Sequence, residues 1–215
     1  MQKLLTLLLL PLSYASFGQA KDGTIKKIYF QMGGGAASHN GSFGEFGVQA
    51  LLKRNWVTTF SYHNIQMDPK NLPSDYDPGY TIFLFIPLEG STPSVDLKLY
   101  SLTAGKHFKT GRNTWFATEG GMSLATGKKI SFTRNTGDLS AWNLLFIAGK
   151  PSNYITDEQK KSSVGGMIKA DMNWAFASFA GLGAGVFASI NSVQSAVGFQ
   201  VKLTCGWMNR TKKHE

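Results

Sequence analysis

The sequence of 215 residues has one cysteine, only 16% charged residues and no long hydrophobic run. A single cysteine excludes a disulfide framework and a thiolate metal cluster. The longest apolar runs, Leu7 to Leu12 and Ile82 to Leu88, are far shorter than the roughly 18 residues that a membrane-spanning helix needs. A helical membrane protein is therefore excluded. Glycine and aromatic residues are abundant instead, with 24 Gly and 15 Phe, and this composition is that of a chain that folds.

The first 18 residues have the features of a secretory signal peptide. Lys3 precedes the apolar run Leu4 to Leu12, and small residues lead up to a cleavage site after Gly18. We expect residues 1–18 to be removed, so that the mature chain begins at Gln19 outside the cytoplasm. The alternative interpretation is a short buried N-terminal segment.

Much of the remaining chain alternates between apolar residues and polar residues or glycine, with a period of two. In the clearest segment, Met172 and Trp174 share one face while Lys169 and Asp171 share the other. Segments of about ten such residues are typical of transmembrane β-barrel strands. Eight of them are Ile28 to Ala37, Phe46 to Leu52, Trp56 to Tyr62, Leu97 to Phe108, Trp115 to Ala125, Val164 to Phe176, Ala180 to Ile190 and Val197 to Trp207.

The connections between these segments differ in length on the two sides. With the N-terminus in the periplasm, the inner connections are short, whereas two outer connections, 67–96 and 126–162, are long. Outer-membrane barrels have this asymmetry. We therefore predict an all-β fold, an eight-stranded antiparallel up-and-down transmembrane β-barrel with two long outer loops. It would occupy residues 19–207 and be followed by a basic C-terminal tail at 208–215.

Aromatic residues lie at the expected inner ends of the strands. Trp56, Trp115, Trp174 and Trp207 would form a girdle there, because indole rings favour the boundary between acyl chains and headgroups. Burial in the core of a soluble sandwich is the alternative for any single ring. A secreted, lipocalin-like ligand-binding barrel is the rival fold, but its polar face would point outward, whereas here the outward face is small and apolar.

Over essentially the whole mature chain, this pattern resembles the small eight-stranded outer-membrane β-barrel proteins of Gram-negative bacteria. The final segment, Val197 to Trp207, is similar to the terminal strand that the assembly machinery recognises in that group, although this chain continues through Met208 to Glu215. The resemblance implies a monomeric barrel in the outer membrane. It carries over no catalytic residue, because no motif identifies a subfamily.

Charged residues fall on the inward parity of the expected strands. Glu119, Lys169, Asp171 and Lys202 would form an ionic network in the lumen, with Glu45 on the same parity. The interior of an eight-stranded barrel is just wide enough for side chains to fill it, and buried charges must be paired. We therefore expect a packed ionic plug, with a proton or ion path as the alternative and no wide pore.

Three residues suggest an enzyme as a second hypothesis. Ser61 and His63 share a face near the outer end of one strand, and Glu45 lies on the adjacent strand. A serine, a histidine and a carboxylate can serve as nucleophile, base and orienting group. A barrel with these residues near the outer leaflet could act as a lipid A acyl-hydrolase or acyltransferase.

We expect no cofactor and no metal. The glycines of Gly181 to Gly185 lack the spacing of a dinucleotide fingerprint, and the four histidines lack metal-ligand spacing. Export makes nucleic acid a remote partner. The formal net charge of +9 is compatible with contact to anionic lipopolysaccharide, although a solvated charged surface is the simpler interpretation.

The function would therefore lie in the outer loops 67–96 and 126–162, in surface interaction or envelope integrity. Each loop contains an unexpectedly apolar stretch, Tyr80 to Leu88 and Trp142 to Ala148. These stretches could extend the barrel as hairpins, cap its mouth, or bind an extracellular or envelope protein.

Overall fold

The computed structural model describes residues 25–83, 86–137, 142–144 and 147–206. The expected signal peptide, the C-terminal tail and Trp207 lie outside these residues. The described chain contains twelve strands and one short 3-10 turn, and no described helix could span a membrane. The elements are β1 Ile25–Ala37, β2 Gly41–Leu52, η1 Lys53–Asn55, β3 Trp56–Met67, β4 Tyr80–Phe83, β5 Ile86–Glu89, β6 Val95–Lys109, β7 Thr114–Arg134, β8 Trp142–Leu144, β9 Ile147–Lys150, β10 Tyr154–Ala175, β11 Ala180–Ile190 and β12 Ala196–Gly206.

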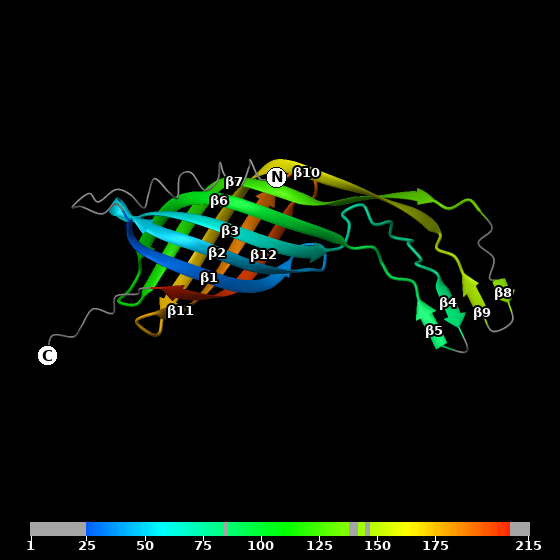
Figure 1. The fold of residues 1–215 in the computed structure, drawn as a ribbon, viewed down its shortest axis with the longest axis horizontal. Helices are drawn as coiled ribbons and strands as arrows, with labels where there is room; N and C mark the ends of the chain where they lie inside the picture. Colours follow the sequence, from blue (N-terminus) through cyan, green and yellow to red (C-terminus); the bar gives the residue numbers. More distant parts are fainter. Residues whose placement is uncertain (1–24, 84–85, 138–141, 145–146, 207–215) are drawn as a thin grey trace, which may run out of the picture.

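Eight of these strands close into a barrel in the order β1-β12-β11-β10-β7-β6-β3-β2 (Figure 1). All neighbours are antiparallel, and the first strand pairs with the last from Tyr29↔Gly206 to Ala37↔Gly198. Closure matters because the hydrocarbon core of a bilayer offers no water to an unpaired strand edge. The predicted transmembrane barrel is thus confirmed.

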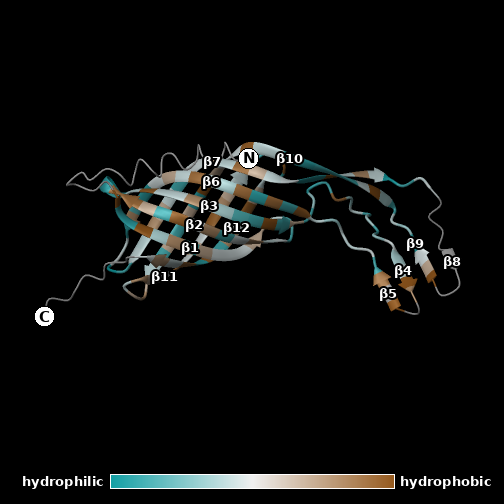
Figure 2. Cartoon of the chain, in the orientation of Figure 1, coloured by the Kyte–Doolittle hydropathy of each residue, from teal (hydrophilic) through white to brown (hydrophobic). Residues whose placement is uncertain are grey.

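Figure 2 shows that hydrophobic and hydrophilic residues alternate along the barrel strands, and the burial of the side chains assigns the two sets to an apolar outer surface and a polar interior. In β12, the outward Phe199 and Val201 are more than half exposed, while the inward Gln200 and Lys202 are buried. Large apolar side chains exposed around the barrel include Phe30, Met32, Phe46, Leu102, Met122, Val164, Ile168, Met172, Val186, Ile190 and Val197. Such a surface is stable only when lipid covers it.

β7 and β10 extend farthest beyond the segments that the alternation indicated. β7 continues to Arg134 and β10 begins at Tyr154, so the two strands pair as a ribbon well beyond the last pair of β6 with β7, Leu97↔Gly127. The expected loop 126–162 is therefore partly a β-ribbon. The hydrophobic pattern missed it because a ribbon in water needs no apolar face.

The two apolar loop stretches form a second sheet at the far end of this ribbon, with strand order β5-β4-β9-β8 (Figure 1). β4 pairs with β9 from Tyr80↔Lys150 to Phe83↔Ile147, so one loop supplies two strands and the other supplies the other two. Of the three roles considered for the stretches, extension above the barrel is the one observed. We call this unit the distal sheet.

Surface labelling tests this topology. Single cysteines at Asp75, Lys150 and Arg112, in a Cys205→Ser background, should react with an impermeant thiol reagent on intact cells at the first two positions only. Asp75 and Lys150 belong to the extension at the end with the long loops, whereas Arg112 lies in the connection between β6 and β7 at the opposite end.

Labelling at position 112 on intact cells would invert the topology. Permeabilised cells provide the control, because all three positions should then react.

Candidate functional site: the barrel lumen

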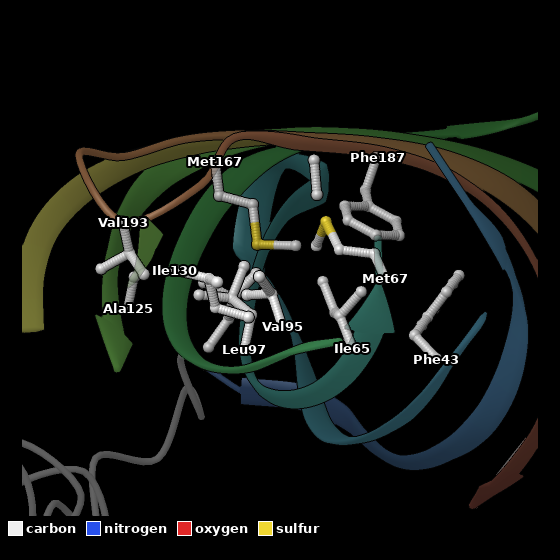
Figure 3. Packing of buried hydrophobic residues seen from close by; sticks show 12 residues of the cluster. Phe43, Ile65, Met67, Val95, Leu97, Ala125, Ile130, Met167, Phe187 and Val193 are labelled. Atoms are coloured by element: carbon white, nitrogen blue, oxygen red, sulfur yellow. The ribbon is translucent and has the colours of Figure 1, made fainter. Parts of the chain in front are cut away.

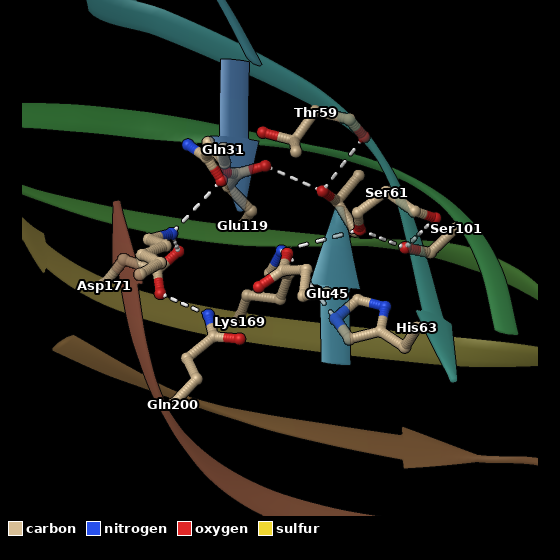
Figure 4. A network of polar contacts seen from close by, with 12 residues as sticks. Gln31, Glu45, Thr59, Ser61, His63, Ser101, Glu119, Lys169, Asp171 and Gln200 are labelled. Atoms are coloured by element: carbon tan, nitrogen blue, oxygen red, sulfur yellow. Dashed lines mark hydrogen bonds and ion pairs between the residues drawn. The ribbon is translucent and has the colours of Figure 1, made fainter. Parts of the chain in front are cut away.

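The lumen holds a buried polar network between two apolar clusters. Its members come from strands β1, β2, β3, β6, β7, β10 and β12, and their side chains converge on the barrel axis (Figure 4). They are buried because the strands carry them on the inward parity of a narrow barrel.

One contact across the lumen is an ion pair between Lys169 of β10 and Glu45 of β2. These strands are not neighbours in the barrel, so the lysine side chain spans the lumen. Both residues are almost completely buried, and Lys169 Nζ also lies 3.5 Å from Ser61 Oγ. An ion pair removed from water gains stability only when its remaining polar atoms are satisfied, and the Ser61 hydroxyl is one such partner.

A second ion pair joins Lys202 of β12 to Asp171 of β10 at 2.7 Å. Gln200 Nε2 donates to the other carboxylate oxygen of Asp171 at 2.8 Å. Both partners lie across β11, where Gly185 and Gly183 face the lumen. A Cβ at Gly185 would overlap the Asp171 carboxylate. The inward glycines of β11 therefore provide the space for this pair.

Glu119 of β7 has neutral partners. Its two carboxylate oxygens accept hydrogen bonds from Gln49 Nε2 at 2.9 Å and Thr103 Oγ1 at 2.7 Å. The sequence placed Glu119 in one ionic network with Lys169, and the register does set them opposite each other. The ion-pair partner of Lys169 is nevertheless Glu45, so the network predicted from Glu119, Lys169, Asp171 and Lys202 was incomplete.

Several buried polar atoms of the network have no hydrogen-bond partner among the described residues. They are Gln31 Nε2, Glu45 Oε2, Gln49 Oε1, both ring nitrogens of His63, Ser123 Oγ, Gln200 Oε1 and Thr204 Oγ1. Buried polar groups are normally satisfied, and water provides partners where protein does not.

Apolar side chains close the lumen toward the end with the long loops. Phe43, Ile65, Leu97, Met167 and Phe187 belong to a buried cluster there, which is drawn in Figure 3. The rings of Phe43 and Phe187 meet edge to face at 4.8 Å. Ions crossing this region would lose their water without gaining polar partners.

A smaller cluster lies at the opposite end and includes Trp115, which the sequence assigned to the girdle. Trp115 is only 7% exposed and stacks on Tyr29 and on His107, each at 5.9 Å between ring centroids. The girdle assignment was wrong for this residue, because Trp115 shares the inward parity of Glu119. Tyr29, Leu51 and Trp115 form the inner cluster.

Trp56 and Trp174 do face outward at the inner end, with exposed fractions of 45% and 51%. Lys106 Nζ lies 4.1 Å from the ring centroid of Trp56, and Trp174 lies beside Phe176. A ring beside a cation suits the boundary where acyl chains meet charged headgroups.

The candidate catalytic residues Ser61, His63 and Glu45 all lie inside the lumen, and none contacts the lipid-facing surface. Ser61 Oγ is 2.8 Å from Ser101 Oγ, and among the described residues no hydrogen bond joins it to His63. His63 Nε2 is 3.5 Å from Glu45 Oε1, an oxygen already occupied by Lys169. The three residues share the inward face of the barrel, and the enzyme stays the second hypothesis.

No group of three or more potential metal ligands occurs in the described chain. In the described part of the lumen, the charged side chains contact one another and their polar neighbours. Two lysines and three carboxylates lie there among hydroxyl and amide groups.

Substitution of Lys169 tests the pairing. Lys169→Ala should lower the free energy of unfolding in detergent by about 3–5 kcal/mol, because it leaves a buried carboxylate uncompensated. Lys169→Met combined with Glu45→Gln should recover most of that loss, whereas Lys169→Met combined with Glu119→Gln should recover less.

Lys160→Ala, on the exposed ribbon, is the matched control and should change stability little. Equal rescue by the two double variants would contradict the assignment of Glu45 as the partner.

Solved structures with a similar fold are small β-barrels. The N-terminal β-barrel domain of Pseudomonas aeruginosa OprF matches with a TM-score of 0.50 and 10% identity, over 84% of this chain and 97% of that one. Ail of Yersinia pestis, in complex with the heparin analogue sucrose octasulfate, matches with a TM-score of 0.46 and 12% identity, over 84% and 97%. Neisserial surface protein A matches with a TM-score of 0.44 and 13% identity, over 85% and 96%.

No protein-family model matches the sequence, and no curated protein matches it. At these identities the likeness concerns the fold alone. The resemblance to small eight-stranded outer-membrane barrels is confirmed at that level: this chain has the fold of an eight-stranded outer-membrane β-barrel.

Proposed function

We propose that this protein is an outer-membrane barrel that acts through its distal sheet in surface interaction. The observation that carries the proposal is that the barrel and the two long loops form separate sheets. Buried polar and apolar side chains occupy the lumen, whereas both long loops contribute strands to one sheet held beyond the barrel. Functional residues are commonly presented on loops that a rigid scaffold positions.

The expected signal peptide supports export, and the apolar outer surface supports residence in a membrane. A change from apolar and aromatic residues to polar and basic residues on the outer surface supports contact with lipopolysaccharide. The outward row Tyr62, Tyr100 and Leu124 is followed one step further out by Asn64 and Lys98. We propose that Lys98 meets anionic groups of the surrounding lipid, which attract basic residues at the membrane surface.

The base of the distal sheet is held by polar contacts. Lys150 Nζ lies 2.8 Å from Asp77 Oδ2, and Ser152 Oγ donates to the Asp77 carbonyl oxygen at 2.9 Å. The Lys150 ammonium and the Gly79 amide keep the pKa of Asp77 below its usual range, and Asp77 in turn raises the pKa of Lys150. Tyr154 Oη donates to Asp75 Oδ1 at 2.9 Å nearby.

This geometry predicts acid sensitivity at the base of the distal sheet. A carboxyl with a depressed folded-state pKa stabilises the structure above its unfolded pKa, about 3.9, and loses that effect as the pH falls through the folded value. Hydrogen exchange of β4 and β9 should therefore be constant between neutral pH and about pH 5 after correction for intrinsic rates, and should increase only in strong acid.

Asp77→Asn should remove that acid step and raise exchange at neutral pH. Exchange that increases between pH 7 and pH 5 would contradict the role of Asp77.

The function is tested by removing the distal sheet. Residues 78–90 and 136–152 are each replaced by a short Gly-Ser linker, and attachment of expressing cells to polystyrene and to a fixed epithelial layer is measured. We expect attachment to fall to the level of cells without the protein, while the barrel still shows heat-modifiable migration on gels.

The double variant Glu45→Gln with Lys169→Met is the matched control, because it changes the lumen and leaves the loops intact. Unchanged attachment without the sheet would overturn the proposal. Increased detergent sensitivity of those same cells would then favour a role in envelope integrity.

A further inference from the structure

One end of the barrel lies opposite the distal sheet in Figure 1 and is strongly basic. Because neighbouring strands are antiparallel, this end brings together the described residues 25–30, 51–56, 106–116, 174–181 and 204–206. We call it the inner rim. These residues include no aspartate and no glutamate. Their basic members are Lys26, Lys27, Lys53, Arg54, Lys106, Lys109 and Arg112.

The carboxylates of the described chain lie elsewhere. Glu45, Glu119 and Asp171 are buried in the lumen. The others all belong to the half of the molecule with the long loops, and they are Asp68, Asp75, Asp77, Glu89, Asp96, Asp157 and Glu158. The described part of the inner rim therefore carries a net positive charge, whereas the opposite end carries both signs.

The basic residues occupy one side of the inner rim. In the order of the barrel, β6, β3, β2 and β1 are consecutive neighbours. Lys106 lies near the end of β6, Arg54 in the turn η1 between β2 and β3, and Lys26 near the start of β1. The connection from β10 to β11, on the other side, carries the exposed rings of Phe176 and Phe179 instead. We call these two parts the basic side and the aromatic side.

The positive charges of the basic side are close enough to act on one another. Lys27 and Lys109 lie on β1 and β6, which are not neighbours, and their charges repel each other. The charges of Lys26 and Lys27 also act on the ring of His107. Like charges held together raise the free energy of the fold, and a bound anion would offset that repulsion.

An aromatic ring among these cations marks the level of the lipid headgroups. Trp56 faces outward, and Lys106 Nζ lies 4.1 Å from the centroid of its ring. Lys106 Nζ also donates to the carbonyl oxygen of Arg54 at 3.5 Å, so both basic residues lie beside the indole. Indole rings favour the boundary between acyl chains and headgroups. Lys106 and Arg54 therefore lie at the depth of the lipid phosphates.

This position favours a lipid over a soluble anion. The exposed ring of Phe108 directly precedes Lys109, and the exposed side chains of Ile28 and Phe30 follow Lys26 on β1. The cations thus continue the surface that the acyl chains cover. A phospholipid of the same bilayer reaches them without leaving the membrane, and basic residues at the membrane surface attract anionic headgroups.

We propose that the basic side of the inner rim is a binding site for anionic phospholipid in the leaflet that faces away from the long loops. Lys26, Arg54, Lys106 and Lys109 contact the phosphate, while Trp56 packs against the adjoining acyl chain. The site is at the opposite end from the distal sheet, so it is independent of the surface-interaction function. Binding involves no covalent step.

Quenching of tryptophan fluorescence by brominated lipid tests the proposal. The full chain is reconstituted in phosphatidylcholine bilayers that contain brominated phosphatidylglycerol or, separately, brominated phosphatidylcholine. The signal of Trp56 is the difference between the unchanged chain and its Trp56→Phe variant. We expect phosphatidylglycerol to be preferred about tenfold over phosphatidylcholine beside Trp56, and the preference to decrease as salt is added, because exposed charges are screened.

Lys106→Gln combined with Lys109→Gln should lower that preference to less than about twofold, because the attraction grows with each basic residue at the surface. Lys129→Gln combined with Lys160→Gln is the matched control, since it removes the same charge from the ribbon and should leave the preference intact. Heat-modifiable migration verifies that each barrel is folded.

Trp174 provides a second reporter, because it lies on the aromatic side. Its signal, obtained in the same way with Trp174→Phe, should show no preference between the two lipids. A preference of the same size at Trp174 would overturn the proposal, because it would show a general attraction to the protein instead of a site.

Other results would also overturn the proposal. Equal quenching of Trp56 by the two lipids excludes the site, as does a preference that survives the Lys106 and Lys109 changes. Loss of the preference on addition of soluble glycerol phosphate would identify the phosphate group alone as the ligand and would exclude a lipid site.

Discussion

The antiparallel pairing of β1 with β12 is the constraint on which the rest of the structure depends. A sheet in hydrocarbon must satisfy every backbone hydrogen bond internally, so the first and last strands have to meet. Closure with eight strands fixes a narrow interior that side chains must fill. The polar network follows from this, because the outward face must be apolar and the alternating parity then places the remaining residues inside.

The lumen combines two physical environments. Lys169, Lys202 and their carboxylates lie between apolar clusters that keep bulk water away, which strengthens their attraction and also raises the cost of losing a partner. Gly185 of β11 shows how the backbone leaves space for a charged group, since a side chain at this position would displace the Asp171 carboxylate. The inward-facing side chains thus both stabilise the barrel and occupy its lumen.

The sequence indicated the barrel because alternation over ten residues reports directly on two faces. It also contained the signal for Trp115, whose parity matches that of Glu119, but position at a strand end was given more weight than parity. The pairing of Lys169 with Glu45 could not be read in the same way, because a lysine side chain spans the lumen and the register identifies only neighbouring strands. The distal sheet was also hidden, since its strands pair across two separate loops.

The ribbon of β7 and β10 limits which insertions and deletions the extension can accept during evolution. Each added residue pair would lengthen the ribbon by about 3.3 Å, and side chains alternate between faces with every step. Insertion of two pairs would therefore raise the distal sheet by about 7 Å and preserve the way it faces, whereas insertion of one pair would turn it over. The length of the ribbon and the direction in which the distal sheet faces are thus linked by the pleat of the strands. Only insertions of an even number of residue pairs keep that direction.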